Sequence, residues 1–305
     1  MQSTSVHKKT RELSVIVPAT NLISDVHDCL AALNLLREDV DLEVLLINRL
    51  GDEVALHVEE QFPWVKIVPV AKSTSIPLMR AHAFRIATKS VVAVIEDHVI
   101  VTQKWAHQLL DAFDEGVEVL GGSVENLACD KLIDWAPFLC EYSHLIPPIP
   151  EGSVDSLAGN NVAYKKTVLD RHLHVADEGH WEHYLHAKLK ESGVELICQS
   201  DLIAGHKKHY TFWEYMSQRY LYARFYSSKR VAQSNIVKKC IYGMGSCILP
   251  PLLFYRIVTR IGEKKEYRTL LIKSLPLISL FVLAWAAGEV VGSLFGEGKS
   301  LEKVC

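Results

Sequence analysis

Residues 13–18 read LSVIVP, a run rich in β-branched residues that ends in a proline. Such a run is typical of a buried parallel strand that leads into a loop. Beyond it, Val26, Leu30 and Leu33 recur at the spacing of a helix with one apolar face. Residues 42–47, LEVLLI, form the next apolar run. This part of the chain therefore predicts a strand–helix–strand unit.

The same alternation continues along the chain. Residues 65–70 (VKIVPV) predict a third strand, residues 78–88 a helix, and residues 91–95 (VVAVI) a fourth strand that leads directly into Glu96-Asp97-His98. Strands that alternate with helices favour an α/β fold with a doubly wound, mostly parallel sheet, in which ligands bind beyond the carboxyl ends of the strands. We therefore expect the ligand-binding residues directly after the apolar runs, at positions 19–21, 48–52, 72–75 and 96–98.

Composition limits the classes of function. The chain has 305 residues, with 33 Lys and Arg against 36 Asp and Glu, so its formal charge of −3 gives no reason to expect a nucleic-acid partner. No GxGxxG or GxxxxGK[ST] motif follows the first strand, which argues against a dinucleotide or P-loop site. The seven cysteines form no CxxC pair, which indicates reduced thiols. The first 15 residues lack the apolar stretch of a signal peptide, which predicts that the globular part is cytoplasmic.

The composition changes beyond residue 230. Residues 240–255 are nearly uncharged, and residues 275–295 are apolar for 21 positions except for Glu289. The second stretch is just long enough to cross a hydrocarbon core of about 30 Å. Between the two stretches, residues 256–268 (RIVTRIGEKKEYR) are rich in cations, as is usual at the cytoplasmic edge of a membrane.

These features predict a catalytic domain over residues 1–230 and a membrane anchor over residues 231–305. The anchor would be a hairpin of two spans, or one span with an interfacial helix. The alternative is a pair of helices that pack on the catalytic domain or on a second subunit, because Glu289 inside the span makes insertion costly.

Glu96, Asp97 and His98 are candidates for a metal site. Two carboxylates and an imidazole at the end of a strand can hold a divalent cation such as Mg2+ or Mn2+, which would neutralise a diphosphate leaving group. The alternative is a surface turn without a ligand.

Two segments further along complete the set of candidates. Residues 156–166 (SLAGNNVAYKK) place a glycine and two asparagines where backbone and amide groups could bind hydroxyls. Residues 177–193 predict a helix that presents Glu182 near its N-terminus, beside Trp181. A carboxylate beside an indole is a plausible general base, although an acid in a first turn also stabilises the helix dipole.

Taken in order, SVIVP, VAVIEDH, GNNVAYKK and WEHYLHAKLKESG resemble the motifs of family 2 glycosyltransferases, which have the GT-A fold. The resemblance covers roughly residues 12–230. It implies a first strand that ends in a proline loop, a DxD-type metal site, an acceptor-side loop and a catalytic helix. The implied reaction is the inverting transfer of a sugar from a nucleotide-sugar donor to a hydroxyl of a glycan or lipid-linked acceptor, as in the synthesis of a surface polysaccharide.

The resemblance also assigns roles to individual residues. Glu96 and His98 correspond to the two DxD acids, with Asp97 between them as a further metal ligand or donor contact, and Glu182 corresponds to the catalytic base. His206 corresponds to a histidine that completes the metal or diphosphate site. The donor-binding candidates are Pro18, Ala19, Asn48, Arg80 and Asp97, and the acceptor-binding candidates are Gly159, Asn160, Asn161 and Trp181. Asn48 stands where the family usually has an aspartate.

Three other functions fit the sequence less well. A nucleotidyltransferase needs a loop rich in glycine and cations after the first strand, and PATNLISD (18–25) is not such a loop. A metal-dependent hydrolase would use His180, His183 and His186, which lack the HExxH arrangement. The third alternative is an inactive, membrane-associated scaffold of GT-A shape, which the absence of a literal DxD favours.

Overall fold

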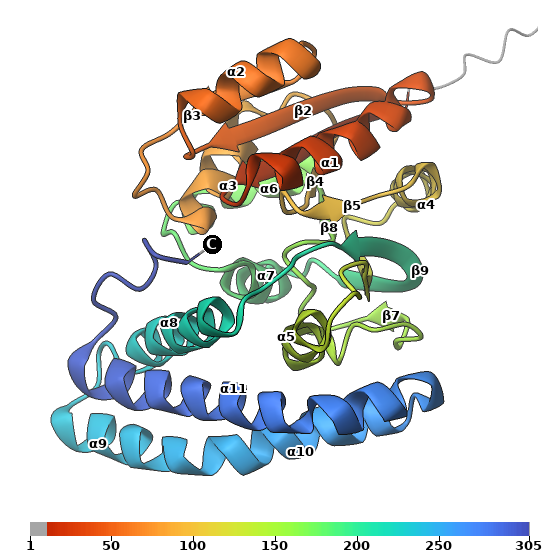
Figure 1. The fold of residues 1–305 in the computed structure, drawn as a ribbon. Coiled ribbons are helices and arrows are strands. Elements are labelled where there is room, and N and C mark those ends of the chain that lie inside the picture. Colours follow the sequence, from red (N-terminus) through yellow and green to blue (C-terminus); the bar gives the residue numbers. More distant parts are fainter. Residues whose placement is uncertain (1–10, 305) are drawn as a thin grey trace, which may run out of the picture. The chain divides into compact units, whose positions relative to one another are not determined.

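The computed structural model describes residues 11–304 and divides the chain into two compact units (Figure 1). Among the described residues, the first unit comprises 11–72, 77–123 and 150–204, and the second comprises 73–76, 124–149 and 205–304. The chain passes from one unit to the other within strands β6 (Val119–Asn126) and β9 (Leu196–His206). In this division residues 205–230 group with the C-terminal helices, and the predicted domain boundary at residue 230 stays a prediction.

The parallel part of the sheet in the first unit confirms the strands expected from the sequence. It contains β1 (Glu12–Ala19), β2 (Asp41–Asn48), β3 (Lys66–Pro69) and β4 (Val91–Val94), side by side in the order β3-β2-β1-β4. Residues 13–19 of the first strand are all buried, as expected for a central parallel strand. The carboxyl ends of β1 and β4 are therefore adjacent.

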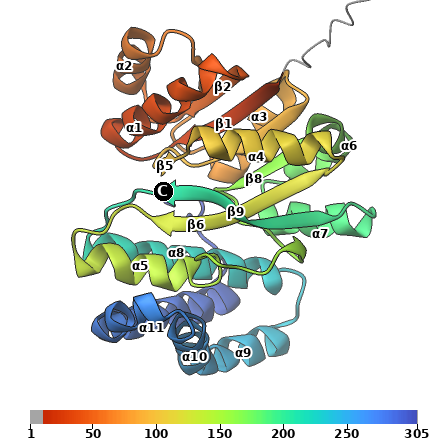
Figure 2. The same ribbon diagram turned by 90° about the vertical axis from the view of Figure 1, so that its right-hand side faces the viewer.

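The remaining strands make the sheet mixed. β8 (Val162–Lys165) lies antiparallel to both β4 and β6, and the order continues β8-β6-β9-β5, with β5 at Val99–Ile100. Strand β7 (Gly152–Ser153) pairs with β9. Strands β6 and β9 run side by side in Figure 2. A Cβ on Gly122 of β6 would lie 2.0 Å from the carbonyl oxygen of Leu202 in β9, so this close approach requires glycine.

Helices pack on the sheet of the first unit. They are α1 (Ile23–Asn34), η1 (Leu35–Glu38), α2 (Asp52–Gln61), α3 (Ile76–Ile86), α4 (Gln103–Asp114), α6 (Lys166–Ala176) and α7 (Glu182–Glu191). The prediction of a helix over 177–193 was too long: residues 177–181 precede α7, and Gly179 adopts a φ of +68° that a helix does not allow.

The second unit is helical. Its elements are α5 (Leu132–Tyr142), α8 (Phe212–Arg230), α9 (Ile236–Gly245), η2 (Ser246–Ile248), α10 (Leu249–Gly262), η3 (Lys265–Tyr267) and α11 (Arg268–Phe295). Helix α11 packs on α8, and it also contacts α5, α9 and α10 (Figure 1). The stretches Ile236–Gly262 and Lys265–Phe295 are long and apolar enough to cross a membrane, which agrees with the two apolar stretches expected from the sequence.

Small residues bring α8 and α11 close together. A Cβ on Gly288 would lie 2.3 Å from the carbonyl oxygen of Tyr220, and one on Gly292 would lie 2.2 Å from that of Arg224. Glu289 lies in the same seam and accepts two hydrogen bonds from Arg230, at 2.9 and 3.1 Å. Glu289, the one acid of the apolar stretch, is therefore paired with Arg230, so no unpaired charge is buried there.

Candidate active site

Asp97 joins the ends of β1 and β4 in the first unit. Its carboxylate accepts hydrogen bonds from the backbone N–H groups of Thr20 and Asn21, at 2.6 and 2.8 Å. The Asn21 side-chain amide and His98 Nδ1 donate to its other oxygen, at 2.6 and 3.1 Å. Burial acts to raise the pKa of Asp97, but the hydrogen bonds outweigh it and lower the pKa below its usual value. Asp97 is thus an ionised carboxylate that fixes the loop after β1.

Glu96 and His98 lie on either side of Asp97 and meet each other. Glu96 Oε2 is 3.3 Å from His98 Nε2. Burial opposes the imidazolium, but hydrogen bonds to Asp97 and Glu96 raise the pKa of His98 to about 9. A bound Mg2+ places neighbouring ligand atoms about 3 Å apart. The oxygen and nitrogen therefore fit a divalent cation, which would replace the shared proton.

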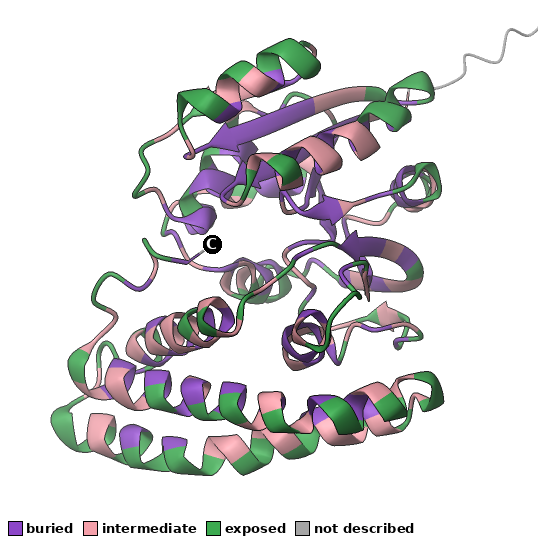
Figure 3. Ribbon diagram, in the orientation of Figure 1, coloured by how far each residue is buried: buried purple, intermediate pink, exposed green. Residues whose placement is uncertain are grey.

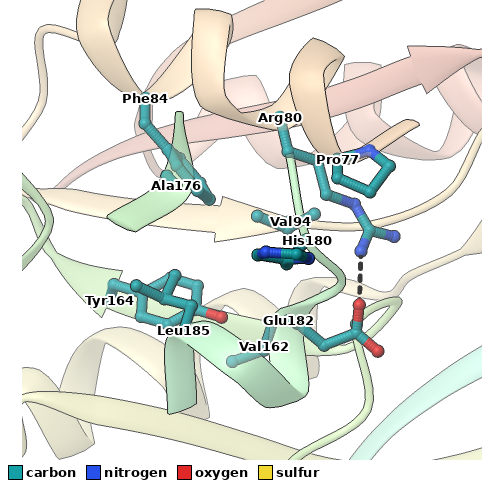
Figure 4. Close-up of a pocket in the computed structure, with 11 residues that line it drawn as sticks. Pro77, Arg80, Phe84, Val94, Val162, Tyr164, Ala176, His180, Glu182 and Leu185 are labelled. Atoms are coloured by element: carbon teal, nitrogen blue, oxygen red, sulfur yellow. Dashed lines mark hydrogen bonds and ion pairs between the residues drawn. The ribbon is translucent and has the colours of Figure 1, made fainter. Parts of the chain in front are cut away.

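Arg80 on α3 connects this acidic strand end to α7. Its side chain is 6% exposed, and it donates to Glu182 Oε2 at 2.9 Å and to Glu96 Oε1 at 3.5 Å. The guanidinium also lies 5.7 Å from the centre of the Trp181 ring. The Arg80–Glu182 pair is drawn in Figure 4. Two carboxylates that are 86 positions apart in the sequence are therefore joined by one cation.

Glu182 is the first residue of α7, and Trp181 is the N-cap. The Trp181 side chain is buried, whereas that of Glu182 is 23% exposed. Gly159 lies directly against this pair, because a Cβ there would be 2.6 Å from the Glu182 carboxylate and 2.7 Å from Arg80 Nη1. The glycine of the GNN segment thus leaves room for the predicted base.

A small pocket of about 20 Å3 lies beside Arg80, Glu182 and Gly159 (Figure 4). Apolar side chains form most of its wall, among them Pro77, Phe84, Val94, Val162, Ala176 and Leu185. His180 and Tyr164 also line it. The Arg80–Glu182 ion pair thus lies at the edge of a mostly apolar pocket.

Tyr164 and His186 form a buried pair that the sequence did not reveal. The N–H of Leu157 donates to His186 Nδ1 at 3.3 Å, and Tyr164 Oη lies 2.8 Å from His186 Nε2. Burial, with smaller effects of His183 and Arg80, lowers the pKa of His186 to about 3, so the ring is neutral. Because Nδ1 accepts a hydrogen bond, the ring proton is on Nε2, which donates a hydrogen bond to the hydroxyl oxygen of Tyr164. The hydroxyl hydrogen of Tyr164 is then available for a hydrogen bond to another group.

The two asparagines after Gly159 are buried. The side chain of Asn161 accepts from Trp105 Nε1 at 2.9 Å and donates to the carbonyl oxygens of Ser123 and Leu202, each at 2.8 Å. These bonds tie the loop to α4, β6 and β9. Acceptor binding by Asn160 and Asn161 stays a prediction.

The donor-binding candidates lie at the ends of β1 and β2. Pro18 and Ala19 are the last residues of β1, and Ala19 pairs with Asn48 at the end of β2. The Asn48 side chain closes its own turn, donating to the carbonyl oxygen of Gly51 and accepting from the N–H of Leu50, both at 2.9 Å. The expected contacts of Pro18, Ala19 and Asn48 with a nucleotide stay predictions.

His206 belongs to the second unit. It ends β9, is buried, and packs against Tyr142, with ring centres 4.9 Å apart. Its role as a metal ligand stays a prediction.

The protein is similar to known proteins in structure rather than in sequence. No protein-family model matches the sequence, and no curated protein sequence matches it. The fold is similar to that of the mannosyltransferase PcManGT from Pyrobaculum calidifontis, solved in complex with GDP-Man and Mn2+, with a TM-score of 0.52 and 14% identity over 91% of this chain and 86% of that one. S. aureus TarS matches with a TM-score of 0.47 and 15% identity over 70% of this chain and 39% of TarS.

At this level of identity the likeness to PcManGT shows the fold. The chain has the α/β architecture of a GT-A glycosyltransferase, with a mostly parallel sheet and two apolar C-terminal helical stretches. Membership of family 2 in particular is not identified by these comparisons.

Proposed function

We propose that this protein is an inverting glycosyltransferase of the family 2 type, which transfers a sugar from a nucleotide-sugar donor to a hydroxyl of a glycan or lipid-linked acceptor. One observation carries the proposal: Arg80 contacts both Glu96, from the acidic strand end, and Glu182, the predicted base. This contact supports a site in which leaving-group stabilisation and proton removal are neighbours, and Arg80 and Glu182 also line the pocket.

Glu182 is the proposed general base. Its carboxylate takes the proton of the acceptor hydroxyl as that oxygen bonds to the anomeric carbon. The bond from the anomeric carbon to the diphosphate breaks on the opposite face, and the diphosphate leaves with the electron pair. The configuration of the sugar is thereby inverted. Glu182 can act only after it separates from Arg80, whose guanidinium is suited to pair with phosphate oxygens instead.

Glu96 and His98 are the proposed holders of a divalent cation, Mg2+ or Mn2+, with Asp97 and His206 as further predicted ligands. When bound, such an ion supplies positive charge to the departing diphosphate. The match to PcManGT, solved with GDP-Man and Mn2+, supports this donor class and this kind of ion. The spacing of Glu96 Oε2 and His98 Nε2, 3.3 Å, supports the same proposal from the side of the protein.

The decisive variant is Glu182→Gln, which keeps the shape of the side chain and its hydrogen bonding but removes the base. We expect transfer to fall by about 10²- to 10⁴-fold while donor binding is retained. The matched control is Glu191→Gln at the other end of α7, where the side chain is 64% exposed. Wild-type turnover by Glu182→Gln would refute the assignment.

A screen of nucleotide sugars, read out as metal-dependent release of nucleoside diphosphate, tests the class of reaction and identifies the donor. The alternative, an inactive scaffold of the same shape, predicts no release with any donor. Substitution of His98 or His206 by alanine should raise the concentration of Mn2+ needed for half-maximal activity, as expected when a metal loses a ligand.

We also propose that the second unit binds a membrane and that the catalytic unit lies on its cytoplasmic side. The two apolar helical stretches support membrane binding. The cation-rich segment 256–268 between them supports the side, because the cytoplasmic leaflet carries the anionic lipids that attract Lys and Arg.

A further inference from the structure

One face of the second unit is apolar and exposed. It is formed by α9, α10 and the side of α11 that points away from α8, and exposed residues run along it in Figure 3. Its exposed apolar side chains include Ile241, Met244, Ile248, Leu252, Tyr255 and Leu283. A soluble protein rarely leaves such a continuous patch uncovered.

The opposite side of α11 is covered by protein along most of the helix. Its buried residues recur every three or four positions, at Leu271, Ser274, Ile278, Phe281, Ala284, Gly288 and Gly292. Helix α8 lies against this side: Tyr215 packs on Phe281 with ring centres 4.6 Å apart, and Arg224 Nε donates to the carbonyl oxygen of Gly296 at 2.9 Å. Contact between the two helices therefore extends over four turns of α11.

This packing decides how the helices can meet a bilayer. If α11 crossed the membrane, α8 would have to enter with it, because glycine contacts and the Arg230–Glu289 pair hold them together. Helix α8 carries Arg219, Arg224, Lys229 and Arg230, and such residues are costly in hydrocarbon. A layer of helices with one exposed apolar face, whose other side is held by the rest of the protein, can instead lie flat at the membrane surface.

The charges around the apolar face fit an anionic surface. Over residues 236–275, the exposed cations are Lys238, Arg256, Arg260, Lys265, Arg268 and Lys273. The exposed acids in the same stretch are Glu263 and Glu266. A groove of about 250 Å3 between α10 and α11, lined by Pro250, Phe254 and Leu283 among others, could hold an acyl chain.

We infer that α9, α10 and α11 lie in the plane of an anionic lipid bilayer, with the apolar face in the acyl layer and α8 on the protein side, and that neither apolar stretch spans the membrane. The inference rests on the membrane binding proposed above. It does not depend on sugar transfer, which can be measured separately with a soluble acceptor.

The turn between α10 and α11 distinguishes the two arrangements. The full chain carrying Glu266→Cys, with Cys129, Cys240, Cys247 and Cys305 replaced by serine, is bound to preformed vesicles of phosphatidylcholine and phosphatidylglycerol. An impermeant maleimide is then added outside. We expect the same labelling of Cys at position 266 with and without detergent, as for a Lys104→Cys control on α4. Labelling only after detergent would mean that the turn has crossed the bilayer, and would refute the inference.

The charge requirement is tested by Lys265→Gln and Lys273→Gln, two exposed cations of the second unit. Each change should weaken binding to the anionic vesicles roughly fivefold, whereas Lys104→Gln on the first unit should leave it unchanged. A chain that stays in solution with vesicles, or one that instead forms a dimer covering the Leu252 face, would overturn the inference. Transfer to a soluble acceptor, measured on the same samples, shows whether the enzyme itself is intact.

Discussion

Gly159 offers a direct test of how tightly the site is built. In Gly159→Ala, the new Cβ would lie 2.6 Å from the Glu182 carboxylate and 2.7 Å from Arg80 Nη1, distances that real Cβ atoms do not show. Because the φ of Gly159 lies outside the left-handed region, the backbone itself accepts alanine. The strain is therefore relieved by movement of the two side chains, by roughly 1 Å, a displacement that can lower kcat by about 10²-fold.

The assay is kcat for release of nucleoside diphosphate at saturating donor and metal, together with a urea unfolding curve. We expect kcat to fall while the free energy of unfolding changes by less than about 1 kcal/mol. Gly245→Ala is the control, because a Cβ there meets nothing within 4 Å. In a Glu182→Asp background, whose shorter side chain withdraws from position 159, the same glycine change should cost less. A Gly159→Ala enzyme with wild-type kcat would refute the proposed role of the Arg80–Glu182–Gly159 contact.

Three further predictions concern stability. The pKa of His186 is about 3 in the folded protein against 6.5 in the unfolded chain, so the contribution of neutral His186 to stability is fully present above pH 6.5 and is lost as the pH falls toward 3. Between about pH 7.5 and pH 5 the free energy of unfolding of the wild type should therefore fall by about 2 kcal/mol on account of His186. In His186→Gln this part of the fall should be absent. Gly292→Ala should destabilise the second unit by about 1–3 kcal/mol, measured by urea unfolding, and unchanged stability would contradict the close α8–α11 contact. Trp105→Phe leaves Asn161 Oδ1 without its donor and should lower the free energy of unfolding by about 1–3 kcal/mol. A thermal midpoint equal to that of the wild type would contradict this prediction.

The parallel strands were predictable because each is an apolar, β-branched run with a helix after it. Strand β6 was not, since its Gly121-Gly122 pair has low strand propensity and is used for a close approach that only the folded sheet requires. Strand β8 is four residues long and was read as part of a loop. The start of α7 was misplaced because the apolar periodicity begins at Trp181, whereas residues 177–181 form a loop in which Gly179 has a positive φ.

At the site, the sequence indicated which residue types belong together but not how they contact one another. The partners of Asp97 include two backbone N–H groups, which no sequence motif displays. The link from Arg80 to Glu96 and Glu182 depends on how α3 packs, and the Tyr164–His186 pair joins β8 to α7. Glu289 was counted as a cost to the C-terminal span because its partner, Arg230, lies 59 positions earlier in the chain.

The glycine contacts between α8 and α11 also have a mechanical consequence. Two helices whose backbones touch, with Gly288 and Gly292 against the carbonyl oxygens of Tyr220 and Arg224, cannot slide or rotate past each other without a clash. The two helices therefore move as one rigid body. A change in lipid packing that tilts α11 at the membrane surface would therefore tilt α8 by the same angle, and the change would reach the side of the second unit that faces away from the lipid.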